Sequence, residues 1–405
     1  MAKQLHRSAL LAAAACGLIA ATTIGPSAGA APSGQASFHL DRVSCPTSTF
    51  CVAVGTRGHR MNGVDNSSKT LVERWNGSKW SIVASPNGSP AGTSTALRDV
   101  SCTGPKFCMA VGAAGTKTIA MTWNGSKWTI VKSANPTNVQ YAFLDGVSCP
   151  SSASCVAVGV QYTPDGRGPT LMERWNGKSW SLMIHAPTPE GNNPVRLNGV
   201  SCPETTNCYA AGEFDLGGPG QPDALILHWN GTKFSLSYPG NTTSVSYLFG
   251  ISCVSAPNCT AVGRLQTVYP SAGPVESFVT RWNGTKWSRA SSPSPGDGLS
   301  ELNGVACTST TQCAAVGDMA TPAGGRTLAE QGSGKVWSQV TSANAGPPAT
   351  ASSLTGVSCR SASSCVAVGN SELQSGTPAE HENTLAEKWN GTSWTIVAGP
   401  TPSAS

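Results

Sequence analysis

The sequence predicts an all-β protein, a ring of seven four-stranded antiparallel blades, and three repeating features predict it. Cysteines occur in pairs with five residues between them, and each pair opens a motif of the form V-S-C-x5-C-V-A-V-G. Tryptophans recur at two fixed positions, and in most repeats an Asn-Gly turn lies between them. The pattern returns seven times with a period of 47 to 57 residues. Four short strands in each of seven such units indicate a β-propeller.

Each repeat contains four predicted strands, which are clearest in the third repeat. The segments 144–149 and 155–159 are rich in β-branched and small residues, which suit a sheet covered on both faces. The segment 170–175 forms the third strand, and the fourth begins at Trp180. Asn176-Gly177 supplies the positive φ of a tight hairpin, so the tryptophans on either side are expected to pair across the strands. Repeat six departs from the pattern, with Gly332 where the first tryptophan is expected.

Fourteen of the fifteen cysteines are expected to form seven local disulfides. The same spacing in every repeat makes pairing within each repeat the simplest scheme, and each bridge then closes the turn between the first two strands. Such a loop gives about 2 kcal/mol per bridge. C-x5-C is not a zinc spacing and no His pairs recur beside it, so we expect no metal and no cofactor. The expected pairs are Cys45 with Cys51, Cys102 with Cys108, Cys149 with Cys155, Cys202 with Cys208, Cys253 with Cys259, Cys307 with Cys313, and Cys359 with Cys365.

Residues 1–30 read as a secretory signal peptide. Lys3 and Arg7 are basic, 9–24 are apolar, and Ala28-Gly29-Ala30 is a cleavage signature. Cys16 lacks the leucine of a lipidation motif, so we expect a released, extracellular protein. Residues 31–405 are expected to form one propeller domain with repeats at about 36–92, 93–139, 140–192, 193–243, 244–297, 298–349 and 350–405. The chain begins and ends in the same repeat phase, so closure is expected from blade packing and not from an exchanged strand.

Composition excludes several classes of function. Charged residues are 12% of the chain and the formal net charge is +5, which is too balanced to favour nucleic acid. No apolar run of membrane-spanning length occurs beyond the N-terminus, so no membrane span is expected. We expect a monomer.

The repeats resemble kelch and WD40-like propellers, and more narrowly a group of secreted bacterial proteins with V-S-C, C-V-A-V-G and W-N-G-x-x-W motifs. The resemblance covers nearly all of the mature chain. It implies the architecture but little chemistry. The kelch double glycine and the WD dipeptide are absent. Gly77 and Trp80 fit the Asp-box of sialidase propellers, but Trp75 stands where Asp belongs.

One end of the propeller is expected to carry the ligand site. The loops joining strands two and three, and the linkers between blades, differ in every repeat, whereas the turns at the other end are uniform. Polar residues predicted on this variable rim are Arg60, Tyr141, Glu190, Arg196, Glu213, Asp223, Tyr238, Arg264, Glu276, Glu372, Glu380 and Glu382. The preferred candidates are Arg57, His59, Asp65, Tyr162, Asp165, Arg167, Asp215, Tyr269, His185 and His381. For each of them the alternative is a solvated loop residue.

A second candidate set follows the leucine of each first strand. If the first strand is innermost, these residues could surround the channel mouth; alternatively they only favour a turn before glycine. The set is Asp41, Arg98, Asp145, Asn198 and Asn303, with Phe249 and Thr355 in the remaining repeats.

Three functions remain open. The preferred one is an extracellular binding module for carbohydrate at the variable rim; an exposed first tryptophan in each pair would favour this. The first alternative is a glycan-processing enzyme, a hydrolase or lyase, at the same rim or channel mouth. Neither G-x-S-x-G, H-E-x-x-H nor a P-loop occurs, so catalysis has no motif to support it. The second alternative is a protein-interaction or inhibitor scaffold.

Overall fold

The computed structural model describes residues 36–61, 64–88, 92–166, 168–183, 195–215, 222–238, 244–267, 273–346, 349–373 and 381–400. All of them belong to one compact unit, Gly34–Ser405. The expected signal peptide lies outside the described residues. The described residues form twenty-eight strands and no helix. They therefore contain no helix that is long and apolar enough to cross a membrane.

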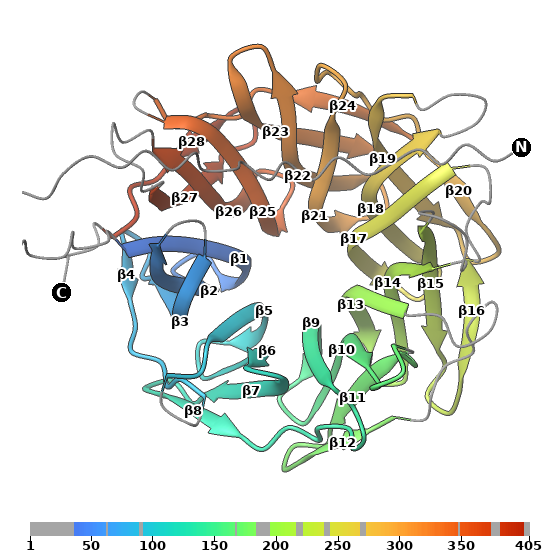
Figure 1. The fold of residues 1–405 in the computed structure, drawn as a ribbon. Coiled ribbons are helices and arrows are strands. Elements are labelled where there is room, and N and C mark those ends of the chain that lie inside the picture. Colours follow the sequence, from blue (N-terminus) through green and yellow to red (C-terminus); the bar gives the residue numbers. More distant parts are fainter. Residues whose placement is uncertain are drawn as a thin grey trace, which may run out of the picture. The chain divides into compact units, whose positions relative to one another are not determined.

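The strands form seven antiparallel sheets of four, and in each sheet the strands follow one another in sequence order (Figure 1). The first strands of the blades are β1 (Ala36–Thr47), β5 (Thr95–Gly104), β9 (Tyr141–Ser151), β13 (Val195–Glu204), β17 (Ser244–Ser255), β21 (Ser300–Ser309) and β25 (Ala349–Ser361). The second strands are β2 (Phe50–Met61), β6 (Phe107–Ala114), β10 (Ser154–Tyr162), β14 (Asn207–Asp215), β18 (Asn258–Thr267), β22 (Gln312–Thr321) and β26 (Ser364–Leu373). The third strands are β3 (Val64–Trp75), β7 (Lys117–Trp123), β11 (Leu171–Trp175), β15 (Pro222–Trp229), β19 (Val275–Trp282), β23 (Gly324–Ser333) and β27 (His381–Trp389). The fourth strands are β4 (Trp80–Ile82), β8 (Trp128–Val131), β12 (Trp180–Leu182), β16 (Phe234–Tyr238), β20 (Trp287–Arg289), β24 (Val336–Val340) and β28 (Trp394–Ile396).

The predicted fold class is confirmed, with seven blades and one local disulfide in each. The first strand of every blade is innermost and contacts the first strands of both neighbours, including β25 against β1 (Figure 1). Blades one and seven each use four consecutive strands, so closure without an exchanged strand is also confirmed.

All seven predicted disulfides are present, and each joins the first two strands of its own blade. The bridge therefore closes the turn between these strands, as the sequence spacing predicts. The bonded pairs, in blade order, are Cys45 with Cys51, Cys102 with Cys108, Cys149 with Cys155, Cys202 with Cys208, Cys253 with Cys259, Cys307 with Cys313, and Cys359 with Cys365.

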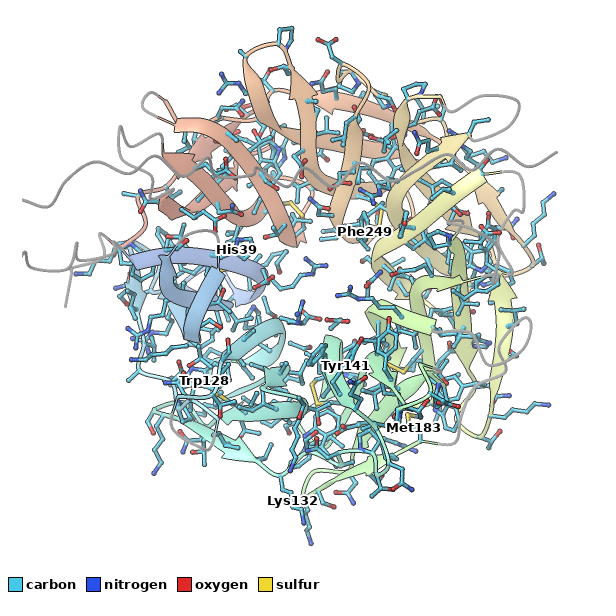
Figure 2. All side chains as sticks on the ribbon, viewed as in Figure 1. His39, Trp128, Lys132, Tyr141, Met183 and Phe249 are labelled. Atoms are coloured by element: carbon cyan, nitrogen blue, oxygen red, sulfur yellow. A yellow bond between two sulfur atoms is a disulfide. The ribbon has the colours of Figure 1, made fainter. Side chains whose placement is uncertain are left out.

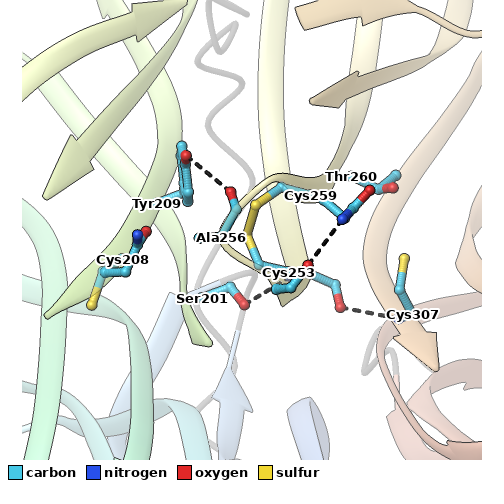
Figure 3. Close-up of a disulfide and its surroundings, with 12 residues drawn as sticks. Ser201, Cys208, Tyr209, Cys253, Ala256, Cys259, Thr260 and Cys307 are labelled. Atoms are coloured by element: carbon cyan, nitrogen blue, oxygen red, sulfur yellow. Dashed lines mark hydrogen bonds between the residues drawn. A yellow bond between two sulfur atoms is a disulfide. The ribbon is translucent and has the colours of Figure 1, made fainter. Parts of the chain in front are cut away.

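The serine of V-S-C links each blade to the next. Cys253 N donates to Ser201 Oγ of the preceding blade at 2.9 Å, as Figure 3 shows beside the Cys253–Cys259 bridge. Equivalent bonds of 2.9–3.0 Å join six of the seven blade pairs, and Cys45 N to Ser358 Oγ closes the ring. The exception follows blade six, where Ala306 replaces the serine.

The tryptophans and the Asn-Gly turns hold the outer half of each blade. Trp75 pairs with Trp80 in register, and their ring centroids are 5.8 Å apart. Gly77 has φ of 100°, and Asn76 Oδ1 accepts from the backbone N of Lys79 at 2.9 Å. The predicted cross-strand pair and positive φ are therefore confirmed. In blade six Trp337 covers Gly332, where an added Cβ would lie 2.5 Å from its ring.

The first blade differs from the prediction at its variable end. Arg57, His59 and Arg60 lie in β2 and Asp65 lies in β3, and Arg60 pairs with Asp65. These residues were predicted in a loop. The interpretation was wrong because the polar stretch continues the backbone ladder of the hairpin, which needs no apolar side chains.

Candidate functional site

Every innermost strand contains a β-bulge one residue after its buried leucine. In β13, Leu197 pairs with Gly212 and Gly199 with Ala211, so Asn198 is the extra residue. A bulge bends the strand and re-aims one side chain. The turn alternative is therefore wrong: these residues lie within paired strands. The seven bulge residues are Asp41, Arg98, Asp145, Asn198, Phe249, Asn303 and Thr355.

The glycine of V-A-V-G makes the bulge possible. A Cβ on Gly212 would lie 1.9 Å from the carbonyl oxygen of Arg196, and the equivalent glycine in every blade would meet a backbone oxygen at 1.9–2.0 Å. No side chain can occupy that space, because the obstacle is backbone.

The glycine after the bulge lets neighbouring innermost strands approach closely. A Cβ on Gly146 would lie 3.0 Å from Gly199 Cα. In blades one and two this position carries Arg42 and Asp99 instead, and sequence analysis missed both. Their only signal is the break in the L-x-G pattern of the first two repeats.

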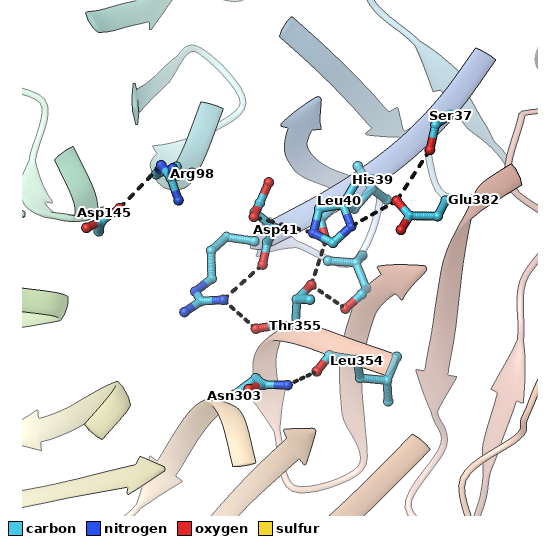
Figure 4. Close-up of polar contacts among 12 residues, drawn as sticks. Ser37, His39, Leu40, Asp41, Arg98, Asp145, Asn303, Leu354, Thr355 and Glu382 are labelled. Carbon is cyan, nitrogen blue, oxygen red and sulfur yellow. Dashed lines mark hydrogen bonds and ion pairs between the residues drawn. The ribbon is translucent and has the colours of Figure 1, made fainter. Parts of the chain in front are cut away.

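Arg42 reaches across the centre of the ring. Its Nη2 donates to the carbonyl oxygen of Phe249 in blade five at 3.2 Å. Its Nη1 donates to the carbonyl oxygens of Asp41, at 3.0 Å, and of Thr355 in blade seven, and Figure 4 draws these two bonds as dashed lines. The carboxylate of Asp99 accepts from Val147 N at 2.7 Å. Burial raises the pKa of Asp99 to about 6, and the charge of Arg42 opposes the rise.

The bulge residues converge on one cavity of about 450 Å³ at the centre of the ring. Figure 2 shows nitrogen- and oxygen-bearing side chains projecting into this opening. The structure thus brings together all five predicted channel-mouth residues and three predicted rim residues, Arg196, Glu213 and Arg264. The lining residues come from all seven blades: Asp41, Arg42, Arg98, Asp145, Arg196, Asn198, Glu213, Tyr247, Phe249, Arg264, Glu301, Asn303, Asp318, Ser353 and Thr355.

Asp145 lies between two guanidinium groups. Arg98 Nε in blade two is 3.3 Å from Asp145 Oδ1, and Arg196 Nε in blade four is 3.1 Å from Asp145 Oδ2. The carboxylate is only 6% exposed, whereas the arginine side chains are 36% and 42% exposed. The carboxylate is thus held beneath two half-exposed cations.

Two carboxyl groups are held by amides instead of cations. Asn198 Nδ2 donates to Glu213 Oε2 at 2.5 Å and to the carbonyl oxygen of Leu248 in the next blade at 2.9 Å. Asn303 repeats this geometry with Asp318 and Leu354 O, at 2.9 and 3.1 Å. Burial raises the pKa of Glu213 to about 7 and also raises the pKa of Asp318.

Aromatic rings and one ion pair line the side at blades five and six. The guanidinium of Arg264 lies 4.5 Å from the ring centroid of Tyr247 and 5.8 Å from that of Phe249. Its Nη1 donates to Glu301 Oε2 at 3.0 Å. Burial and the neighbouring Asp318 raise the pKa of Glu301.

A histidine joins blades one and seven at the edge of the mouth. His39 Nε2 is 3.5 Å from Asp41 Oδ1, and His39 Nδ1 is 3.8 Å from Glu382 Oε2 (Figure 4). Ser37 Oγ donates to the same Glu382 oxygen at 3.3 Å. The serine is bonded to the carboxylate and not to the imidazole, so this is not the arrangement of a serine nucleophile with its base.

Of the preferred rim candidates whose side chains are described, Tyr162, Arg57 and Asp165 do not line the cavity. Tyr162 ends β10 and packs on Tyr141, with ring centroids 4.6 Å apart, and burial raises its pKa. Arg57 is exposed on β2, and Asp165 is exposed in a turn, where it accepts from Thr163. Arg167, His185 and Tyr269 lie outside the described residues. For His59, Asp65, Asp215 and His381 only the backbone is described, at strand positions.

The first tryptophans are buried in their hairpins. Trp75, Trp123, Trp175 and Trp389 are 2–7% exposed, and the indole N–H of Trp75 donates to the carbonyl oxygen of Ser48 in the adjoining turn. The repeated exposed aromatic sites that would favour a lectin are absent at these four positions.

A second cavity, of about 490 Å³, lies at the outer edge of blades two and three. Its lining includes Lys132, labelled in Figure 2, with Lys178, Trp180 and Leu182. It gathers two lysines but no carboxyl group. Among the described residues no group of three or more His, Cys, Asp or Glu side chains could hold a metal ion.

Comparison with known proteins supports the architecture. No protein-family model matches the chain, and no curated protein matches it. Two structures of an ulvan lyase of a polysaccharide lyase family, one bound to -[GlcA(1-4)Rha3S]-, align with a TM-score of 0.54 at 8% identity over 86% of this chain and 94% of theirs. YCF48 bound to D1 peptide aligns with a TM-score of 0.45 at 13% identity, over 74% and 80%. At 8% identity the similarity to the ulvan lyase shows the fold alone.

Proposed function

We propose that this protein is a secreted binding module that holds a carbohydrate at the mouth of its central channel. The observation that carries the proposal is the bulge in every innermost strand, which directs one side chain from each of seven blades into one cavity. A cavity of about 450 Å³ has the size of a small-molecule site. Its mixture of guanidinium, carboxyl and amide groups with two aromatic rings matches the hydroxyl groups and apolar faces of a sugar.

Three further observations support the proposal. Arg42 lines the cavity and donates to carbonyl oxygens of blades five and seven, so a fixed guanidinium is part of the polar lining. Seven disulfides are typical of an oxidising compartment, which supports secretion together with the N-terminal leader signature. Among proteins of this fold, the ulvan lyase has been solved with a saccharide bound.

Glycan processing is the second candidate function, and the carboxyl groups of the mouth favour it. Glu213 has a pKa raised to about 7, and the pKa values of Glu301 and Asp318 are also raised. A carboxyl group that keeps its proton near neutral pH can act as a general acid. Binding is preferred because these groups are engaged by Asn198, Arg264 and Asn303.

A polysaccharide screen of the purified, oxidised protein tests both functions. Each glycan is scored for retention and for released products. We expect retention without products, and we expect Phe249→Ala at the channel mouth to weaken retention by about tenfold through loss of an aromatic contact. Ile396→Ala, at an exposed position on the outer strand β28, is the control and is expected to bind normally.

The two scores separate the alternatives. Released products would make the protein an enzyme and would direct mutagenesis to Glu213, Glu301 and Asp318. The absence of both retention and products would contradict the glycan proposal and favour a protein partner. Retention unchanged by Phe249→Ala would place the glycan elsewhere on the protein.

A further inference from the structure

Two arginines share the single carboxylate of Asp145, so this cluster has an excess of positive charge. Arg98 and Arg196 come from blades two and four, and Asp145 comes from the blade between them. The three groups together carry a charge of +1 at neutral pH. The second side chain that could balance them, Glu213, is bonded through Oε2 to Asn198 and has a pKa raised to about 7, so it is only partly ionised there.

Most of the donors on these two arginines make no hydrogen bond within the part of the chain that the structure describes. Each guanidinium carries five N–H donors, and each contacts Asp145 through its Nε. Among the described residues, neither arginine donates a hydrogen bond through its Nη groups. Both side chains are more than one-third exposed and line the cavity. The buried Asp145 therefore anchors two forks whose outer ends are open to the mouth.

The geometry matches what a carboxylate or a sulfate group requires. Guanidinium forks bind carboxylate and sulfate oxygens through paired, charge-assisted hydrogen bonds. Three further acidic groups line the mouth, and each has another partner. Asp41 lies beside His39, Glu301 pairs with Arg264, and Asp318 accepts from Asn303 and Ser353. Aromatic rings at Tyr247 and Phe249 line the same cavity and offer a surface for the sugar ring that would carry the anion.

From this juxtaposition we infer that Arg98 and Arg196 form a subsite for a carboxylate or sulfate group, so that the preferred ligand is an acidic saccharide. The inference rests on the proposed glycan-binding function and narrows it. A neutral sugar would leave the outer donors of both arginines to water, whereas a uronate or a sulfated sugar would satisfy them.

Calorimetric titration of the full oxidised protein tests the subsite with two matched pairs of probes. Oligogalacturonate is compared with its methyl ester, and dextran sulfate with dextran. We expect the charged member of at least one pair to bind at least about tenfold more tightly than its neutral partner, with affinity falling as salt is added. Preference within the first pair identifies carboxylate as the source of the charge, and preference within the second identifies sulfate.

Two substitutions are expected to change the affinity for the charged probe in opposite directions, which distinguishes an effect on binding from a loss of folding. Arg196→Gln removes one guanidinium group and is expected to lower the affinity for the charged probe by about tenfold. Asp145→Asn raises the local charge from +1 to +2 and is expected to tighten binding severalfold, which a damaged fold would not do. Arg289→Gln is the control, since Arg289 is half-exposed on the outer strand β20 and pairs with Glu276.

The outcomes distinguish this inference from the proposed function. Equal binding of the charged and neutral members in both pairs would overturn the acidic subsite and leave glycan binding intact. Binding of charged probes that is unaffected by both Arg196→Gln and Asp145→Asn would overturn the assignment to these residues. If no probe binds, the subsite is wrong, and the wider polysaccharide screen then decides whether the glycan function also fails.

Discussion

At the scale of single residues, the second-strand glycine and the bulge opposite it depend on each other. The backbone oxygen that faces Gly112 would lie 2.0 Å from a Cβ, and it belongs to Ala96, two residues before the bulge residue Arg98. Removing the glycine therefore displaces the strand that aims Arg98 into the channel mouth.

Gly112→Ala is expected to destabilise the protein by about 2–4 kcal/mol, because the clash is with backbone and cannot be relieved by a rotamer change. Gly104→Ala in the same blade is the control, since nothing lies within 4 Å of its Cβ position. Chemical denaturation of both oxidised variants measures the difference. Similar stabilities for the two variants would contradict the proposed role of the glycine.

Part of the channel mouth could be predicted from these residue patterns, and part could not. The position after the leucine is periodic, so Asn198 and Asn303 could be placed near the axis from the sequence. Their partners Glu213 and Asp318 follow the second-strand glycine, which resembles the start of a variable loop. Only the register of the folded strands shows that these carboxyl groups turn inward. Arg42 was missed because it replaces a glycine and does not repeat.

At the scale of strands, the V-S-C serine converts a local motif into a link between blades. Six blade pairs share the bond from a cysteine N–H to the preceding serine Oγ. The sequence pattern shows that the serine recurs but not why, since its partner is about fifty residues away. Blade six carries Ala306 at this position, so the backbone N–H of Cys359 has no equivalent serine to bond.

Ala306→Ser is expected to stabilise the protein by about 0.5–1.5 kcal/mol by completing this set of bonds. Ser201→Ala removes an existing bond and is expected to cost a similar or larger amount, because it leaves the Cys253 N–H without its acceptor. Thermal unfolding of the two variants and the parent protein measures the expected gain and the expected loss of stability in one experiment. A destabilised Ala306→Ser variant would show that the contact between blades six and seven excludes a hydroxyl group.

At the scale of the whole molecule, buried carboxyl groups of the third strands also join the blades. Glu387 of blade seven accepts from Ser342 Oγ at 2.9 Å and from Ala343 N at 3.2 Å, both in the linker that leaves blade six. Glu173 holds Ser133 and Ala134 of the second linker in the same way. Burial raises the pKa of Glu387, like those of Glu73 and Glu330, to about 7, and raises the pKa of Glu173 as well.

These raised pKa values predict that stability falls as the pH rises through the neutral range. Each carboxyl group binds its proton more tightly in the folded protein than in the unfolded chain, where the pKa is near 4.5. The stabilisation is therefore fully present below about pH 4.5 and is lost as the pH rises through about 7. Burial lowers the pKa of His228 and so opposes the trend below about pH 6.5. This single histidine is outnumbered by the buried carboxyl groups with raised pKa values, which also include Asp99 and Glu213.

We expect the melting temperature of the oxidised protein to be several degrees higher at pH 5 than at pH 8. Glu387→Gln keeps an oxygen that can accept from Ser342 but cannot ionise, so it should reduce the slope between these pH values. Glu276→Gln is the matched control, because the Glu276 side chain is 42% exposed and pairs with Arg289. A melting temperature that rises from pH 5 to pH 8, or a Glu387→Gln variant with the parent's slope, would show that these buried carboxyl groups stay ionised and that the blade contacts accommodate their charge.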